Sequence, residues 1–267
     1  MPLFRRQVIK PTADLDAVEY IGRAKITDVV AQNAINDFVL GMKALGLYNS
    51  MVSWPLRSSQ NAGTGTTAYS LGGLGTFNGT LTNGPAWGAN GIVLSSIAHE
   101  ITLPDSPSLY NSRTGFVVFS PSSTSNNQKL IEFQDNATLQ GWYYLFRYGS
   151  GNDEPGLRFI ATRNSTASGN APSSQLTLLN SFQTGAFTAN DTSDNLFRNG
   201  SLVSDGARTG LLALNPTGPR VIRQLFGNTS SMVGSFGFVS TSTLTNANIT
   251  SLHALYKTTL GAGLGLP

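Results

Sequence analysis

The pattern that most constrains this chain is a series of short apolar runs between about residues 47 and 240, separated by Gly, Asn, Ser and Thr. Short runs rich in β-branched and aromatic residues, bounded by turn-forming residues, are typical of β-strands. About ten runs at this spacing predict an antiparallel sandwich or barrel over residues 47–241. The predicted strands are 68–72, 91–97, 113–120, 129–135, 141–149, 156–163, 174–181, 195–204, 220–227 and 234–241.

One turn can be specified from the sequence. Asn199 and Gly200 stand between two short apolar runs in NLFRNGSLV. A two-residue type I′ turn needs positive φ at both central positions, and Asn and Gly tolerate that conformation best. We predict a tight β-hairpin at this pair.

Residues 26–46 predict an amphipathic helix in front of the β region. Thr27 or Asp28 can cap its N-terminus, and Gly46 stands where a left-handed residue would end it. Apolar residues recur at three- and four-residue spacing, so one face requires burial against the domain behind it or against copies of itself. The residues that we predict to form an interface between chains are Ile35, Phe38 and Met42.

The last segment, residues 242–267, predicts a second helix and a Gly-rich tail. Thr245 is a suitable N-cap, and Gly261 follows the last apolar position. Helices therefore flank both ends of the β region. The apolar positions of the second helix are Ile249, Leu252, Leu255, Tyr256 and Leu260.

Residues 1–25 read as an arm that cannot form a core of its own. Its tip is apolar and basic, and Phe4, Arg5 and Arg6 are its predicted contacts with a partner. An arm of this kind is either a disordered terminus or a segment laid along another molecule. We favour an anchoring arm.

Composition excludes several classes of protein. Only 12% of the residues are charged, so the pI of 9.3 does not reflect a basic stripe that could bind nucleic acid. The chain has no cysteine, which excludes disulfides and thiolate metal sites. No apolar segment is long enough for a membrane span or a signal peptide, so we expect a protein that is made and kept inside a cell until something releases it.

No residue pattern predicts catalysis, a metal site or a cofactor. His99-Glu100 lacks the second His of a zinc-protease helix, because position 103 is Leu. The other histidine, His253, reads as a surface or interface residue of the last helix. Glu132 and Asp135 are three apart in a strand, so they point to opposite faces. The acidic Asp153-Glu154 turn is ordinary, and the loop Asn190, Asp191, Asp194 and Asn195 is read as a turn in preference to a calcium site.

The aromatic run GWYYLFRYG leaves two alternatives open. Strand alternation places Trp142 and Tyr144 on one face, together with Phe146 and Tyr148. That face is either part of the core or an exposed platform on which sugar rings stack. Trp142 and Tyr144 are the binding residues that we predict for the second case.

The order of these segments resembles phage virion proteins with a concanavalin A-like, laminin-G-type domain. The similarity covers about residues 25–260 and does not extend to the arm. It implies a jelly-roll sandwich between two helices, in a structural component of a virion such as a head fibre, a capsid decoration protein or a tail fibre. The helix positions that carry it are Ile26, Thr27, Asp28, Ala34, Ile35, Asn36, Lys43, Gly46, Leu47 and Met51.

The resemblance gives the leading functional hypothesis: a virion protein without enzymatic activity, anchored by its N-terminal segment with the sandwich facing outward. Its expected partners are other capsid or tail proteins and further copies of itself, as a homotrimer or another homo-oligomer. The alternative is a carbohydrate-binding, lectin-like module that recognises host glycans. A glycoside hydrolase is disfavoured, because two carboxylates converging on one cleft are not evident in the sequence.

Overall fold

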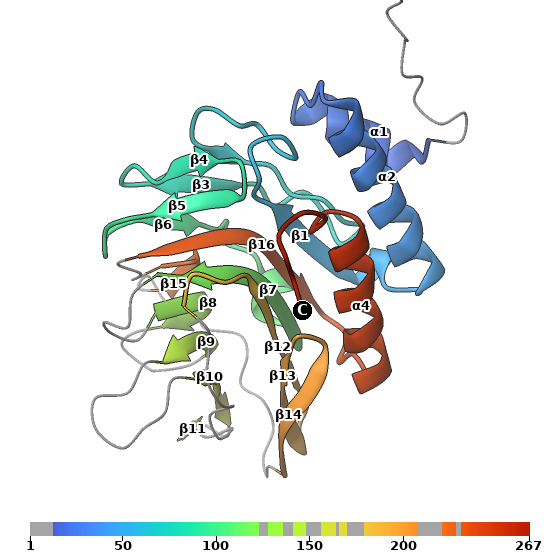
Figure 1. Ribbon diagram of the computed structural model, residues 1–267. Helices are drawn as coiled ribbons and strands as arrows, with labels where there is room; N and C mark the ends of the chain where they lie inside the picture. The colour runs from blue at the N-terminus through green and yellow to red at the C-terminus, as the bar shows by residue number, and fades with distance from the viewer. Residues whose placement is uncertain are drawn as a thin grey trace, which may run out of the picture.

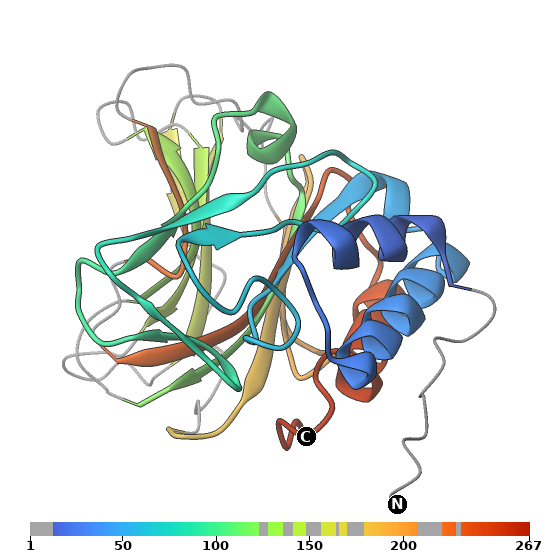
Figure 2. The same cartoon turned by 90° about the horizontal axis from the view of Figure 1, so that it is seen from above.

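The computed structural model describes residues 13–122, 128–135, 141–147, 156–163, 166–169, 179–207, 221–227 and 231–267; for residues 135, 141–147, 156, 158–163, 166–169 and 221–222 it describes the backbone alone. The described part has three layers, in which two antiparallel sheets stack face to face and helices cover one of them (Figures 1 and 2). The predicted fold class, a mainly β sandwich flanked by helices, is confirmed.

Sheet A is the middle layer. Its strands run in the order β14 (Ser201–Ala207), β13 (Ser193–Arg198), β12 (Gln183–Ala189), β7 (Thr114–Pro121), β16 (Met232–Ser240), β5 (Gly91–Leu94) and β4 (Ala86–Gly88), and β1 (Met51–Pro55) also pairs with β16.

Sheet B is the outer layer on the other side. Its order is β11 (Thr166–Gly169), β10 (Gly156–Arg163), β9 (Gly141–Arg147), β8 (Gln128–Asp135), β15 (Val221–Leu225), β6 (Glu100–Thr102), β3 (Gly79–Thr82) and β2 (Thr67–Ala68).

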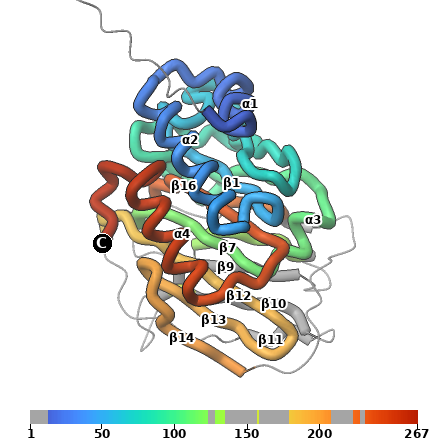
Figure 3. The backbone as a smooth tube through the Cα atoms, turned by 90° about the vertical axis from the view of Figure 1, so that its right-hand side faces the viewer, coloured from blue at the N-terminus to red at the C-terminus, as the bar shows by residue number. Residues whose placement is uncertain are grey.

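The helical layer consists of α1 (Leu15–Arg23), α2 (Val29–Ala44) and α4 (Asn246–Thr258), which lie across the same face of sheet A (Figure 3). A 3₁₀ turn (Tyr48–Ser50) joins α2 to β1, and the short α3 (Pro107–Tyr110) precedes β7.

Most predicted strands are found, but the predicted runs miss β1, β3, β4, β6, β11 and β12. β3, β4, β6 and β11 have only three or four residues, too few for a clear alternation. β1 is short and follows the 3₁₀ turn, and β12 is interrupted by the small residues Gly185 and Ala186. The predicted run 174–181 lies mostly outside the described residues.

The centre of sheet A is buried on both faces: all eight residues of β7 are buried, and its sequence TGFVVFSP contains four consecutive apolar residues. Along β7, Val117 and Phe119 point into a hydrophobic cluster between the two sheets, which we call the inter-sheet cluster. Phe116 and Val118 point the other way, into a helix-side cluster between sheet A and the helices. The helices therefore cover one side of the hydrophobic core.

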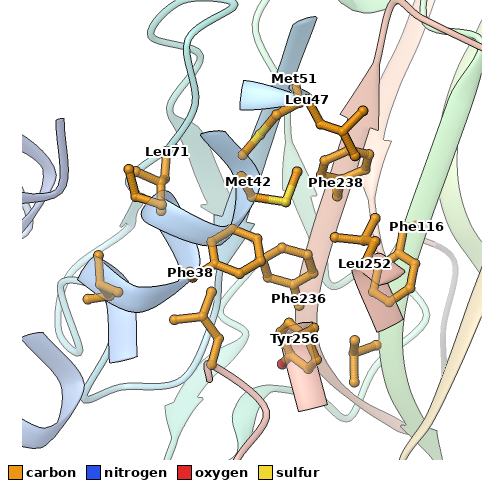
Figure 4. Packing of buried hydrophobic residues seen from close by; sticks show 14 of the residues in the cluster. Phe38, Met42, Leu47, Met51, Leu71, Phe116, Phe236, Phe238, Leu252 and Tyr256 are labelled. Carbon is orange, nitrogen blue, oxygen red and sulfur yellow. The ribbon is translucent and has the colours of Figure 1, made fainter. Parts of the chain in front are cut away.

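Helix α2 forms as predicted, but its apolar face contacts its own chain. The Asp28 carboxylate accepts hydrogen bonds from the backbone N–H groups of Val30 and Ala31 and caps the helix. The Phe38 ring lies edge-on to Phe236 of β16, with centroids 5.7 Å apart (Figure 4). This corrects the predicted interface: Ile35, Phe38 and Met42 are all fully buried within this chain, so none can contact a second molecule.

Part of the predicted arm also belongs to the fold. Helix α1 buries Ala17 and Tyr20 completely, and the Tyr20 hydroxyl donates to the carbonyl of Gln60 at 2.7 Å. The Lys43 ammonium on α2 lies 2.7 Å from the Asp14 carboxylate. Residues 13–25 therefore pack on the molecule, which corrects the boundary drawn at residue 25. Phe4, Arg5 and Arg6 lie outside the described residues.

The predicted hairpin and second helix are confirmed. Asn199 has φ 50° and Gly200 has φ 77°, the positive values that a type I′ turn requires. Thr245 caps α4 by accepting from the N–H of Asn248. One residue of α4 was wrongly placed: His253 is 8% exposed and lies between the Thr184 hydroxyl and the carbonyl of Pro267.

Candidate functional site

A row of polar side chains crosses the outward face of sheet B. Strand register places Glu132 of β8 beside Gln224 of β15, Gln224 beside Thr102 of β6, and Thr102 beside Thr80 of β3. Their neighbours along the strands enter the inter-sheet cluster, so the row faces away from sheet A. Those neighbouring core residues are Ile131, Leu225, Ile101 and Leu81. We call the four polar residues the sheet B row.

One end of the row holds a buried carboxylate. Glu132 is 2% exposed, and each of its oxygens accepts one hydrogen bond: Oε1 from the Lys129 ammonium at 2.6 Å and Oε2 from the Gln224 amide at 2.6 Å. A buried charge is stable only when it is paired and hydrogen-bonded in this way. The contacts hold the side chains of β8 and β15 in one arrangement.

The other end of the row is open to solvent. The Thr102 hydroxyl donates to Glu100 at 2.9 Å and lies 2.7 Å from the hydroxyl of Thr82, while Thr80 is exposed. Hydroxyl groups therefore lie beside the Glu100 carboxylate on the outward face of sheet B. Such a surface both donates and accepts hydrogen bonds, which is the chemistry that sugar hydroxyls require.

Sequence reasoning considered Glu132 but missed its partners. Gln224 is 92 residues away from it, and only the pairing of β8 with β15 brings the two together. The available signal was the alternation of the polar residues Glu132 and Gln134 in β8, whereas β15 offers only Gln224 on the matching face.

The aromatic candidates lie on β9, of which the structure describes the backbone. The Cα of Trp142 is registered opposite Phe133 and that of Tyr144 opposite Ile131. The side chains of Trp142 and Tyr144 lie outside the described residues, so the choice between core and sugar platform stays open. Asp153 and Glu154 also lie outside them.

The remaining polar candidates make local contacts. His99 Nδ1 accepts from the backbone N–H of Ser95 at 3.3 Å. Asn190 Oδ1 accepts from the N–H groups of Thr192 and Ser193, which makes the loop an Asx turn. Among the residues that the structure describes, no three His, Cys, Asp or Glu side chains are grouped as metal ligands would be. None of the described helices has both the length and the hydropathy of a membrane span.

Burial shifts the pKa values of several groups in the helical layer, among them Tyr48, His253 and Tyr256. The pKa of Tyr48 rises to about 12, mainly because burial disfavours the phenolate. The pKa of His253 falls, chiefly through burial, although its hydrogen bond to the Pro267 carbonyl acts in the opposite direction. Burial also raises the pKa of Tyr256, whose hydroxyl lies 3.1 Å from that of Ser235. None of these groups belongs to the sheet B row.

No protein-family model matches this sequence, and no curated protein matches it. Solved structures resemble its fold. Trypanosoma rangeli sialidase is 11% identical with a TM-score of 0.54, over 86% of this chain and 39% of the sialidase. A variant of the protein HCR/D is 16% identical with a TM-score of 0.54, over 78% of this chain and 52% of HCR/D. The chain thus spans about two fifths of the sialidase, and the likeness shows a β-sandwich fold.

Proposed function

We propose that this protein is a carbohydrate-binding, lectin-like module, with the sheet B row as its binding surface. The observation that carries the proposal is the polar row itself, which runs across four strands from the fixed Glu132 carboxylate to the exposed Thr80. Glu132 and Gln224 hold one end rigid, and the hydroxyls of Thr102 and Thr80 contact the sugar. A preorganised polar surface loses little entropy on binding.

A glycan array tests the proposal. The wild-type protein should bind at least one glycan, and Thr102→Val should weaken that binding because it removes a hydroxyl from the accessible end of the row. Thr64→Val, in an exposed loop, is the matched control and should bind as the wild type does. Absence of binding to every glycan, or equal binding by both variants, would overturn the proposal.

Trp142→Ala on the same array separates the two readings of the aromatic run. If the ring stacks on a sugar, binding should fall while the melting temperature stays unchanged. If the ring belongs to the core, the melting temperature itself should fall, because losing a buried Trp costs about 3 to 5 kcal/mol.

The proposal contains no catalytic step. The described part of this face holds the Glu132 carboxylate, whose two oxygens already accept hydrogen bonds, and the Glu100 carboxylate, which accepts from Thr102 and is separated from Glu132 by strand β15. Cleavage of a glycosidic bond ordinarily uses two carboxyl groups that face the scissile bond. We therefore expect the purified protein to leave a fluorogenic glucoside and a fluorogenic galactoside intact, and turnover of either above background would contradict this.

A second proposal concerns where the module works: we infer that it is a structural component of a phage virion. The observation that favours it is α2. The segment that resembles virion proteins, from Ile26 to Met51, forms a capped helix that a 3₁₀ turn joins to the first strand of the sandwich. In this proposal the segment before residue 13 anchors the chain to a capsid or tail protein, and copies associate as a homo-oligomer.

Reconstruction of intact particles tests the virion proposal. We expect density for the sandwich on the particle surface and an oligomeric protein in solution. A purified protein that is monomeric, together with its absence from intact particles, would reject this second proposal and leave the glycan proposal to its own test.

A further inference from the structure

Four Asn-Gly pairs in the sequence share a chemical weakness. Glycine has no Cβ, so its backbone nitrogen can approach the side-chain amide carbon of the asparagine before it and react with that carbon. Because the four pairs consist of the same two residues, a large difference in their reactivity must come from the fold around each pair. The pairs are Asn78-Gly79, Asn83-Gly84, Asn90-Gly91 and Asn199-Gly200.

The glycine is buried in three of the four pairs. Gly79 of β3 is paired in the β2–β3 ladder, and Gly91 of β5 is paired in the β4–β5 ladder. Gly200 packs against His253 of α4. Moving any of these glycine nitrogens toward the asparagine side chain would break the packing around it. Local opening of the structure must therefore precede the reaction at these three pairs.

Two of the three pairs also hold the asparagine side chain. Asn78 Oδ1 accepts from the backbone N–H of Ser70 at 3.0 Å, and Asn199 Oδ1 accepts from that of Thr184 at 3.0 Å. These bonds fix the position of the amide carbon. Its approach to the glycine nitrogen would break them, which further slows the reaction.

Asn83-Gly84 is the pair that the fold leaves open. It lies in the connection between β3 and β4, where the chain crosses from sheet B to sheet A. Both residues are exposed, and no other part of the chain lies within 4 Å of the position that a Cβ on Gly84 would take. Among the described residues, no backbone carbonyl accepts from the N–H of Gly84. The contact that holds the Asn83 side chain is a hydrogen bond from Nδ2 to the carbonyl of Ala98 at 2.8 Å.

We propose that Asn83 is a site of spontaneous deamidation, which converts it into aspartate and isoaspartate. The Gly84 nitrogen gives up its proton and bonds to Cγ of Asn83. The bond from Cγ to Nδ2 then breaks, and the nitrogen takes up a proton and leaves as ammonia. The product is a five-membered cyclic imide. Water opens this ring: attack at Cγ gives aspartate, and attack at the main-chain carbonyl carbon gives isoaspartate.

Deamidation changes both a contact and the charge of this connection. A carboxylate cannot donate to the carbonyl of Ala98, so the bond between the connection and the loop at residues 95–99 is lost. The new negative charge comes one residue after Thr82, which is registered opposite Glu100, and neighbouring like charges are unfavourable. We expect the deamidated chain to be less stable. This inference does not depend on glycan binding.

Peptide mass spectrometry of the full chain after incubation tests the proposal. A sample unfolded in guanidinium chloride is the matched control, because all four pairs are then accessible. Folding should leave the rate at Asn83 within about threefold of its unfolded value and should slow the other three at least about tenfold. The rate at Asn83 should rise with pH, because the attacking nitrogen must lose a proton. Equal protection of all four pairs, or faster reaction at Asn199 than at Asn83 in the folded chain, would overturn the proposal.

Two variants separate the reaction from its consequence. Asn83→Gln keeps the amide but lengthens the side chain, so ring closure should be at least about tenfold slower. Asn83→Asp is one of the two products and should lower the melting temperature by about 2 °C. Asn90→Asp makes the same change at an exposed residue between β4 and β5 and should leave it unchanged. Acid formation in Asn83→Gln at the wild-type rate would contradict the cyclic imide, and equal melting temperatures of the two Asp variants would contradict the loss of the Ala98 contact.

Discussion

Glu132 illustrates at the residue scale how one buried charge depends on its neighbours. Its carboxylate would be very unfavourable in the interior if Lys129 and Gln224 did not donate to it. Both partners lose their acceptor if the carboxylate is removed. The side chain of Lys129 is 19% exposed, so its ammonium would reach water only in part.

We expect Glu132→Ala to lower the free energy of unfolding by about 3 kcal/mol, because it removes a buried carboxylate that accepts hydrogen bonds from Lys129 and Gln224. Urea denaturation measures the change. Glu19→Ala is the control: Glu19 pairs with Arg23 on the surface and is 65% exposed, so its removal should cost well under about 1 kcal/mol. Similar decreases in the free energy of unfolding of the two variants would show that the buried hydrogen bonds of Glu132 contribute no more to stability than a surface ion pair does.

His253 predicts a pH dependence of stability. Burial lowers its pKa in the folded state below the ordinary 6.5, so the unfolded chain takes up a proton first as the pH falls. Stability is therefore fully present above pH 6.5 and is lost as the pH falls below it. The loss is at most about 1.4 kcal/mol per pH unit. Melting curves at pH 7.5 and 5.5 measure it, and His253→Gln should show a smaller difference between them than the wild type.

At the element scale, the β13–β14 hairpin joins a local turn to a distant helix. Gly200 sits in the left-handed region, and a Cβ at this position would approach the His253 ring to 3.0 Å. The Thr250 hydroxyl of α4 donates to the carbonyl of the same glycine at 2.7 Å. The turn is thus held by its own sequence and also by α4.

Gly200→Ala should destabilise the protein by about 1 kcal/mol or more, through the strained φ and the contact with His253. Gly22→Ala makes the same chemical change in α1, where φ is ordinary and no atom lies within 4 Å of the new Cβ. That control should be neutral or slightly stabilising. Thermal melts of the two variants compare them directly, and an unchanged melting temperature in Gly200→Ala would be evidence against the strain.

At the scale of the whole molecule, sheet A links two hydrophobic clusters into one core. Phe236 and Phe238 of β16 face the helices, whereas Val239 of the same strand belongs to the inter-sheet cluster. Figure 4 shows Phe38 of α2 and Tyr256 of α4 gathered around Phe236. A sandwich without its helices would expose this apolar face to water, so helices and sandwich should fold together.

We therefore expect a single cooperative unfolding transition. Phe38→Ala in the helix-side cluster and Phe133→Ala in the inter-sheet cluster should each lower its midpoint, by about 3 to 5 kcal/mol in free energy. Far-ultraviolet and near-ultraviolet circular dichroism should report the same midpoint for each variant. Leu40→Ala, at an exposed position of α2, is the control. Two separate transitions would mean that the layers fold independently.

The sequence by itself determined the features that depend on neighbouring residues. The Asn199-Gly200 turn, the Asp28 and Thr245 caps and most of the strands follow from local φ preferences, side-chain hydrogen bonds to nearby backbone groups, and hydrophobic periodicity. Only the tertiary structure decided what covers each apolar face. The pattern of α2 required a partner surface but was equally compatible with a second chain, and the structure places its own sheet A there.

The sheet B row also depends on tertiary structure. Its groups come from strands that are far apart in the chain, such as Glu132 with Gln224. Local sequence carries no information on which distant strand becomes a neighbour, because that choice minimises the free energy of the whole core. The residue types of the row could be read from the sequence, but the contacts between them could not.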